Sequence, residues 1–190
     1  MRFQHCAIVV GLITGAALAG SGCNDTVLPN ALYDNRVDTL TLTAVDGTPV
    51  AKASALDIAT PPAPRPMRTD LSTAWDFVFN IDTLGRALLI PSNALHLSNS
   101  SGLQLITNTS FSELRVAPGS GYNSDSATVV VPGYVVAIRS RLVNCELGTL
   151  FYYGKLRVLT VDLTARELTF EVLGDLNCGY RSLEPGHPTQ

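Results

Sequence analysis

Hydrophobic and polar residues alternate with a period of two along much of the chain, which is the pattern of half-buried β-strands. The sharpest alternation lies in residues 75–82, whose predicted core-facing side chains are Trp75, Phe77, Phe79 and Ile81. Large aromatic side chains on one face of a strand bury much apolar area, so this segment should dominate the core. We therefore expect an all-β fold, built as a single antiparallel β-sandwich or barrel-like domain.

The predicted strands are separated by turn and loop signals. Strand patterning covers residues 37–45, 50–58, 75–82, 85–90, 94–97, 103–107, 127–131, 134–143, 155–163 and 167–173. Asp46-Gly47 predicts a hairpin between the first two strands, and Thr164–Arg166 predicts one between the last two. Residues 134–143 should form a strand that places Tyr134, Val136, Ile138 and Leu142 on one face. The proline-rich segment 60–66 cannot be a central strand, because prolines lack the amide hydrogen.

The first 23 residues have the layout of a secretory signal peptide. A positive start at Arg2 precedes the uncharged apolar run Cys6–Ala19, and small residues follow it. This run is shorter than the ~20 apolar residues that a membrane-spanning helix requires. The sequence therefore predicts export.

Two exits from the signal peptide compete. Ala17-Leu18-Ala19 fits ordinary A-x-A cleavage, whereas Gly20-Ser21-Gly22-Cys23 resembles a bacterial lipobox, in which Cys23 receives the lipid. Gly20 departs from the Leu that usually begins that motif. With lipidation the anchored protein belongs to the bacterial cell envelope, at the outer membrane or its periplasmic face. Without it the protein would be secreted, or soluble in the periplasm.

Cysteine parity favours the lipid anchor. Cys6 leaves with the signal peptide, so Cys23, Cys145 and Cys178 remain. An odd number of cysteines is uncommon in an exported chain. If Cys23 is lipidated, Cys145 and Cys178 are left to form one disulfide in an oxidising compartment.

Length and charge limit the remaining possibilities. A chain of 190 residues fits one domain. We assign residues 1–22 to the signal peptide, 23–36 to a tether, 37–181 to the β domain and 182–190 to a disordered tail.

Charged residues make up 15% of the chain and the net charge is −3, so the sequence has no basic surface for nucleic acid. It also lacks the H-E-x-x-H, C-x-x-C and G-x-S-x-G motifs, so we expect neither an enzyme nor a metal site.

Several motifs, in their order along the chain, resemble the HmuY-like family of haem-binding bacterial lipoproteins. The family's Trp-Asp-x-x-Phe strand is similar to residues 75–79, and its Ala-Pro and Gly-Tyr pairs are similar to 117–118 and 121–122. Its Tyr-Val-Val strand and Lys-Leu-x-Val strand are similar to 134–136 and 155–158. The resemblance covers about residues 37–173 and implies an all-β domain that captures haem and passes it to an outer-membrane receptor.

The resemblance also implies candidate ligands for haem iron. The best-known members of the family hold the iron between two histidines, and after export this chain offers only His96 and His187. Tyrosine can also bind haem iron. The available tyrosines are Tyr122, Tyr152, Tyr153 and Tyr180. We take His96 and Tyr122 as the candidate ligand-binding residues, with haem as the possible cofactor.

Two hypotheses follow. The first is a non-enzymatic exported lipoprotein whose HmuY-like β domain binds a ligand, with haem as the candidate. The alternative is a structural or protein-interaction lipoprotein on the same fold, with no small-molecule site.

Overall fold

The computed structural model describes residues 28–97 and 100–188. The predicted signal peptide, the lipidation site Cys23 and the first residues of the tether lie outside the described residues. Within them the chain forms ten strands and one short 3₁₀ helix, η1 (Ser92–Leu95). The strands are β1 (Val37–Thr43), β2 (Ala55–Asp57), β3 (Arg65–Met67), β4 (Phe77–Ile81), β5 (Ala87–Pro91), β6 (Gly102–Ile106), β7 (Thr128–Val130), β8 (Val135–Cys145), β9 (Gly148–Asp162) and β10 (Glu167–Asp175).

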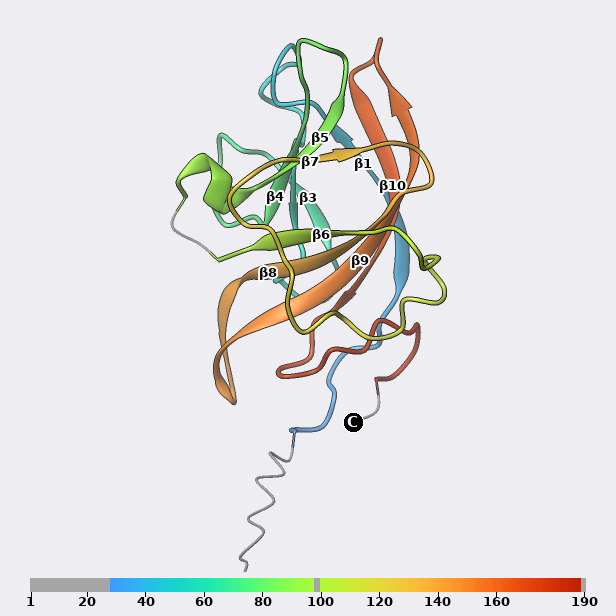
Figure 1. Cartoon of the computed structure of the whole chain (residues 1–190). Coiled ribbons are helices and arrows are strands. Elements are labelled where there is room, and N and C mark those ends of the chain that lie inside the picture. Colours follow the sequence, from blue (N-terminus) through green and yellow to red (C-terminus); the bar gives the residue numbers. More distant parts are fainter. Residues whose placement is uncertain (1–27, 98–99, 189–190) are drawn as a thin grey trace, which may run out of the picture.

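The strands build two antiparallel sheets that pack face to face (Figure 1). One sheet, which we call the long sheet, has the order β1-β10-β9-β8-β6. The other, the short sheet, has the order β3-β2-β4-β5-β7. The predicted all-β sandwich is confirmed.

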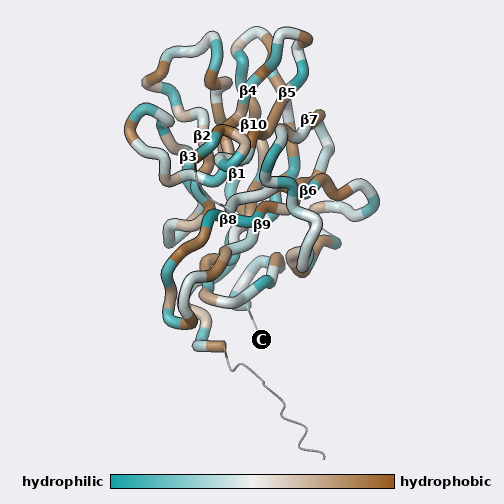
Figure 2. The backbone as a smooth tube through the Cα atoms, turned by 60° about the vertical axis from the view of Figure 1, so that its left-hand side comes forward, coloured by the Kyte–Doolittle hydropathy of each residue, from teal (hydrophilic) through white to brown (hydrophobic). Residues whose placement is uncertain are grey.

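The main hydrophobic core fills the space between the sheets. Its largest buried side chains include Phe77 and Phe79 from β4 and Phe170 from β10. Figure 2 shows hydrophobic and hydrophilic segments interleaved along the strands, as a two-faced sheet requires. The prediction that Phe77, Phe79 and Ile81 form the core is therefore confirmed.

Trp75 and Asp76 do not follow the alternation predicted for their segment. Trp75 lies in a separate cluster with Ala55 and Val78, on the outward face of the short sheet. Asp76, which the alternation would place on the face opposite the predicted core residues, is 1% exposed. The pairing of β4 begins only at Phe77, so the period of two does not extend back to these two residues.

Both ends of the 134–143 segment also depart from the prediction. Tyr134 lies in the turn before β8 and is 41% exposed. Leu142 is exposed as well, because the register of β8 against β9 shifts between Arg139 and Leu142. Such an irregularity reverses which side chains face the core.

The hairpin predicted at Asp46-Gly47 is wrong. The chain does turn there, and Gly47 has a φ of 74°. The following strand β2 pairs with β3 and β4 instead of β1, so the turn carries the chain from one sheet to the other. The predicted hairpin between β9 and β10 is confirmed.

The two ends of the described chain lie together against the long sheet. Asn35 and Gly186 exchange backbone hydrogen bonds of 2.9 Å in both directions. Leu183 is completely buried, and Ser182 N–H donates to Asp175 Oδ2. Leu183 belongs to the hydrophobic cluster on the outward face of the long sheet, so the described C-terminal segment helps to cover that face.

Candidate functional site

The outward face of the long sheet is covered by two segments without strands or helices, residues 107–127 and 176–188. Together they form a second hydrophobic cluster on this face, made of Phe111, Leu114, Ala117, Val135, Ala137, Leu173 and Leu183. The covering segments act as a third layer. Hollows at the edges of this layer are the natural places for a ligand, because loops on a rigid scaffold commonly carry function.

Lys155 holds the first covering segment to the sheet. Lys155 is 1% exposed, and its Nζ donates to the carbonyl oxygens of Phe111 at 2.5 Å and Leu114 at 3.0 Å. Nζ also lies 4.4 Å from the centre of the Phe111 ring. Burial lowers the pKa of Lys155. A buried cation that bonds two loop carbonyls fixes the position of the loop.

A cavity of about 430 Å³ opens beside this anchored loop, where β6 ends and β8 begins. Its apolar wall consists of Leu105, Ile106, Phe111 and Val135. The polar groups around it are supplied by Thr107, Thr109, Ser110, Tyr134 and Arg157. We call this cavity the Tyr134 hollow.

The backbone fixes Tyr134 at this hollow. Tyr134 N–H donates to Val131 O, and Tyr134 O accepts from Val158 N–H at 3.0 Å. The preceding Gly133 has a φ of 90°, a conformation that favours glycine. Arg157 lies on the outward face of β9, 5.9 Å from the Phe111 ring centre, and its Nε pairs with Glu171 at 2.7 Å.

The chemistry of the Tyr134 hollow suits an amphipathic ligand. An apolar wall takes an apolar or aromatic body, the phenol offers a hydrogen bond or a metal ligand, and a guanidinium attracts a carboxylate. Sequence analysis missed this site because it placed Tyr134 within a strand, on the same face as Val136 and Ile138. The Pro132-Gly133 turn directly before Tyr134 is the signal that could have moved it outside.

His96 lies in a different and polar place. The strand predicted at 94–97 is wrong: His96 ends η1 with a φ of 60°, and its amide donates to Asn93 O. It is exposed and lines a second cavity of about 430 Å³ together with Asn93, Ala94 and Asp125. Asn93 Nδ2 donates to Asp125 Oδ1 at 2.7 Å. Among the described residues, those that line this hollow provide no large apolar wall to hold a porphyrin.

Tyr122 does not join His96 in that cavity. It lies half-buried over the outward face of the long sheet, with its ring 6.1 Å from that of Tyr153. Burial raises the pKa of Tyr122 above its usual range. The tyrosines at 152 and 180 are buried, and Tyr180 OH donates to Pro29 O. The structure therefore does not bring the predicted ligand residues together.

Between the two sheets lies a buried charge network that sequence analysis also missed. Arg141 of β8 pairs with Asp57 of β2, with 2.8 Å between Nη1 and Oδ1. Asp76 Oδ1 accepts from Arg141 N–H at 2.6 Å, and Asp76 Oδ2 accepts from Ile58 N–H at 2.7 Å. The two carboxylates are buried and the Arg141 side chain is 18% exposed, and the network joins the sheets.

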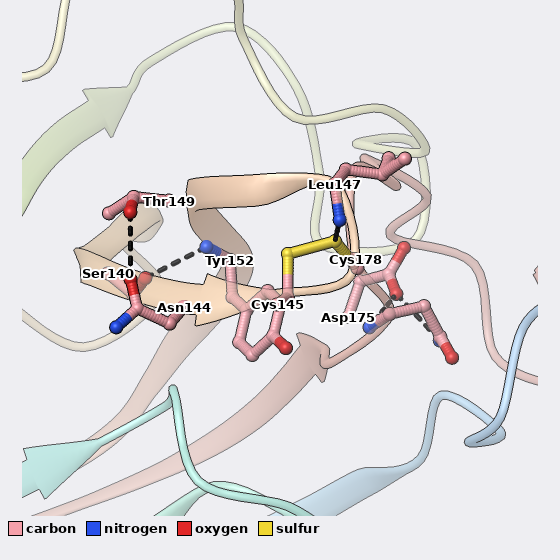
Figure 3. The surroundings of a disulfide bond; sticks show 9 residues. Ser140, Asn144, Cys145, Leu147, Thr149, Tyr152, Asp175 and Cys178 are labelled. Carbon is pink, nitrogen blue, oxygen red and sulfur yellow. Dashed lines mark hydrogen bonds between the residues drawn. A yellow bond between two sulfur atoms is a disulfide. The ribbon is translucent and has the colours of Figure 1, made fainter. Parts of the chain in front are cut away.

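The predicted disulfide between Cys145 and Cys178 is confirmed (Figure 3). It connects the end of β8 to the covering segment that follows β10. Leu147 N–H points to the sulfur of Cys178 at 3.4 Å, beside the turn into β9. The bridge thus ties the tip of the longest hairpin to the C-terminal part of the chain.

Over residues 28–97 and 100–188, no group of three or more His, Cys, Asp or Glu side chains could hold a metal ion. Within the same residues, no helix is long and apolar enough to cross a membrane. No family model matches the chain, and no similar curated protein or solved structure was found.

Proposed function

We propose that this chain is a non-enzymatic lipoprotein of the bacterial cell envelope, anchored through Cys23, whose β-sandwich binds a small amphipathic ligand. The observation that carries the proposal is the Tyr134 hollow, with its apolar wall and its tyrosine and arginine. Its volume of about 430 Å³ lies within the ~300–1,000 Å³ of typical ligand sites. The disulfide supports export, because such bonds persist in oxidising compartments.

Haem is the candidate ligand. The family resemblance implies two histidines as iron ligands, and the residues of this chain fit iron coordination only in part. A pair of histidines does not fit, because His187 bonds Asp34 near the chain ends whereas His96 lies beside Asp125. Tyr134 fits better as a single ligand, since phenolate oxygen binds haem iron in some proteins. Arg157 would then attract a propionate, and Phe111 would pack on the porphyrin. Bound haem would supply a redox-active iron and a strong absorption band.

A haem titration of the purified exported protein tests this proposal. We expect a Soret shift at micromolar haem that is lost in Tyr134→Phe, a change that removes only the hydroxyl. His96→Ala is the matched control and should leave the spectrum unchanged. No shift in the wild-type protein would remove haem as the ligand. A shift that disappears in His96→Ala and survives in Tyr134→Phe would move the site to the polar cavity.

The alternative remains a protein-interaction lipoprotein with no small-molecule site. Exposed apolar side chains support it, because Val129, Val131 and Leu163 line an open groove of about 280 Å³. Under this alternative the Tyr134 hollow takes up neither haem nor another apolar chromophore. A titration with an apolar fluorescent dye separates the two functions, since only the ligand-binding protein should show saturable binding that Phe111→Ser weakens.

A further inference from the structure

Five polar side chains gather on the outward face of the long sheet, away from the Tyr134 hollow. Three stand on neighbouring strands, since Arg139 of β8 lies opposite Tyr153 of β9 and Gln104 of β6 pairs with the nearby Ala137. Tyr122 comes from the first covering segment and Arg181 from the second. We call Gln104, Tyr122, Arg139, Tyr153 and Arg181 the arginine–tyrosine cluster.

Each arginine of this cluster lies near one of its two tyrosine rings, and the two rings are tilted by 47° to one another. Arg139 Cζ lies 5.3 Å from the centre of the Tyr122 ring, and Arg181 Cζ lies 5.5 Å from that of Tyr153. The two tyrosine rings are 6.1 Å apart. Gly121 packs so closely on the Gln104 side-chain amide that a Cβ there would lie 3.0 Å from Nε2. The cluster is therefore compact, with Arg139 near the Tyr122 ring and Arg181 near the neighbouring Tyr153 ring.

Four polar atoms of the cluster are buried without a hydrogen-bond partner: Gln104 Oε1, Tyr122 OH, Arg139 Nε and Arg181 Nε. A buried donor or acceptor that stays unpaired destabilises the folded protein, because it has lost its hydrogen bonds to water. In the described part of the chain the only other buried side-chain atom of this kind is Asn35 Oδ1. Three unpaired donors and one unpaired acceptor therefore lie together in this cluster, and their concentration points to a bound ligand.

The two arginines of the cluster also lack a carboxylate as a counter-ion in the described part of the chain. Among the described residues neither Arg139 nor Arg181 forms an ion pair with a carboxylate. Arg139 Nη2 donates to Ser100 O and Ser124 Oγ, and Arg181 Nη2 donates to Ala117 O. Burial raises the pKa of the Tyr122 phenol, whereas the charges of Arg181 and Arg139 act to lower it. Two uncompensated guanidinium groups favour an anion with several oxygens.

We propose that the arginine–tyrosine cluster binds a phosphate group that carries one proton. Arg139 Nε, Arg181 Nε and Tyr122 OH donate to its unprotonated oxygens. Gln104 Oε1 accepts the hydrogen bond from its protonated oxygen, a match that neither sulfate nor a phosphodiester offers. Tyr122 is half-buried, and movement of its side chain is the route that we propose for phosphate to reach the two arginines. This site is independent of the Tyr134 hollow.

Calorimetric titration of the purified exported protein with inorganic phosphate and with glycerol 3-phosphate tests the proposal. At pH 6 about half of a phosphomonoester carries one proton. Saturable binding of both compounds supports a phosphomonoester ligand, and binding of inorganic phosphate alone supports the free ion. Binding of neither, or equal binding of sulfate at the same ionic strength, overturns the proposal.

Two variants connect the binding to the cluster. Arg181→Gln should weaken phosphate binding about tenfold or more, as expected for loss of a charge-assisted hydrogen bond. The matched control is Arg115→Gln, which removes an exposed arginine paired with Glu184 and should bind phosphate normally. Tyr122→Phe keeps the ring and its packing, so it should fold, and it should bind about three- to tenfold more weakly. Undiminished phosphate binding in Tyr122→Phe would show that the phenol is not part of the site.

Discussion

Arg141 and Asp57 form an ion pair that joins the two sheets of the sandwich, with 2.8 Å between Nη1 and Oδ1. Asp57 is completely buried, and its other oxygen accepts from Arg65 at the surface. Burial raises the pKa of Asp57, but hydrogen bonds from Arg141, Thr60 and Ala59 together outweigh it and hold the pKa below its usual value. The carboxylate is therefore charged and depends on Arg141.

Replacing Arg141 by Met should lower the free energy of unfolding by about 3–5 kcal/mol, because two carboxylates would lose the cation they share. Urea unfolding at pH 7 measures the change. Arg86→Met is the control, since Arg86 is 54% exposed and its pair with Asp82 should contribute no more than about 1 kcal/mol. Equal effects of the two substitutions would contradict a buried interaction between the sheets.

The second carboxylate of the network predicts a pH dependence. Burial raises the pKa of Asp76 to about 6, against the opposing effects of the Arg141 charge and of the amides of Arg141 and Ile58. Between its ordinary value of 3.8 and about 6, the folded protein holds the proton more tightly than the unfolded chain does. The contribution of Asp76 to stability is therefore greatest at low pH and decreases as the pH rises through this window.

Asp76→Asn isolates that contribution. The difference in unfolding free energy, wild type minus variant, should decrease by about 2 kcal/mol from pH 4.5 to pH 7.5. Urea unfolding of both proteins at the two pH values gives the difference, and the other carboxylates largely cancel in it. A difference that increases with pH would mean that hydrogen bonding to the carboxylate outweighs burial.

The contrast between β4 and Asp76 shows what the sequence could predict. Phe77 and Phe79 were placed correctly because alternation is a local property of the strand and one face is always buried. Asp76 was misplaced because its partner Arg141 lies 65 residues away, on a strand of the other sheet. No local pattern reports which sheet a strand joins, and for the same reason the Asp46-Gly47 turn was mistaken for a hairpin.

The candidate site was even less predictable than the fold. The Tyr134 hollow needs the end of β6, the start of β8, a side chain of β9 and the loop at Phe111 in one place. That loop is positioned by a lysine 44 residues away from Phe111. The family resemblance directed attention to His96 and Tyr122, whose side chains could bind haem iron. His96 lies in a polar cavity, however, and Tyr122 packs beside the tilted ring of Tyr153.

Lys155→Met should loosen the loop that forms one wall of the Tyr134 hollow. The substitution keeps the apolar stem and removes the two hydrogen bonds to Phe111 O and Leu114 O, which should cost about 2 kcal/mol of stability. Hydrogen exchange should show faster exchange at the Leu114 amide, which donates to Ser110 O. Lys52→Met, at an exposed position, is the control. Unchanged exchange at Leu114 would show that Lys155 does not hold the loop.

The disulfide should stabilise the fold by constraining the unfolded chain. Cys145 and Cys178 are 33 residues apart, a loop for which chain entropy predicts about 3–4 kcal/mol. The double substitution Cys145→Ser with Cys178→Ser should lower the unfolding free energy by that amount. Dithiothreitol should destabilise the wild type similarly and leave the double variant unaffected. A wild-type midpoint that does not respond to complete reduction would contradict this role.

Formation of that bridge agrees with the cysteine parity that favours lipidation of Cys23, so the anchor can be tested directly. Protein from membranes should partition into the detergent phase of Triton X-114, and intact mass should show a diacylglycerol adduct on a chain that begins at Cys23. Cys23→Ser should move the protein to the aqueous phase, because the acyl chains supply the apolar contact with the membrane. Cys6→Ser is the control, since this cysteine lies in the predicted signal peptide and its substitution should not change the mature mass. A mature chain that begins at Gly20, with Cys23 unmodified, would establish the Ala17-Leu18-Ala19 exit and a soluble exported protein.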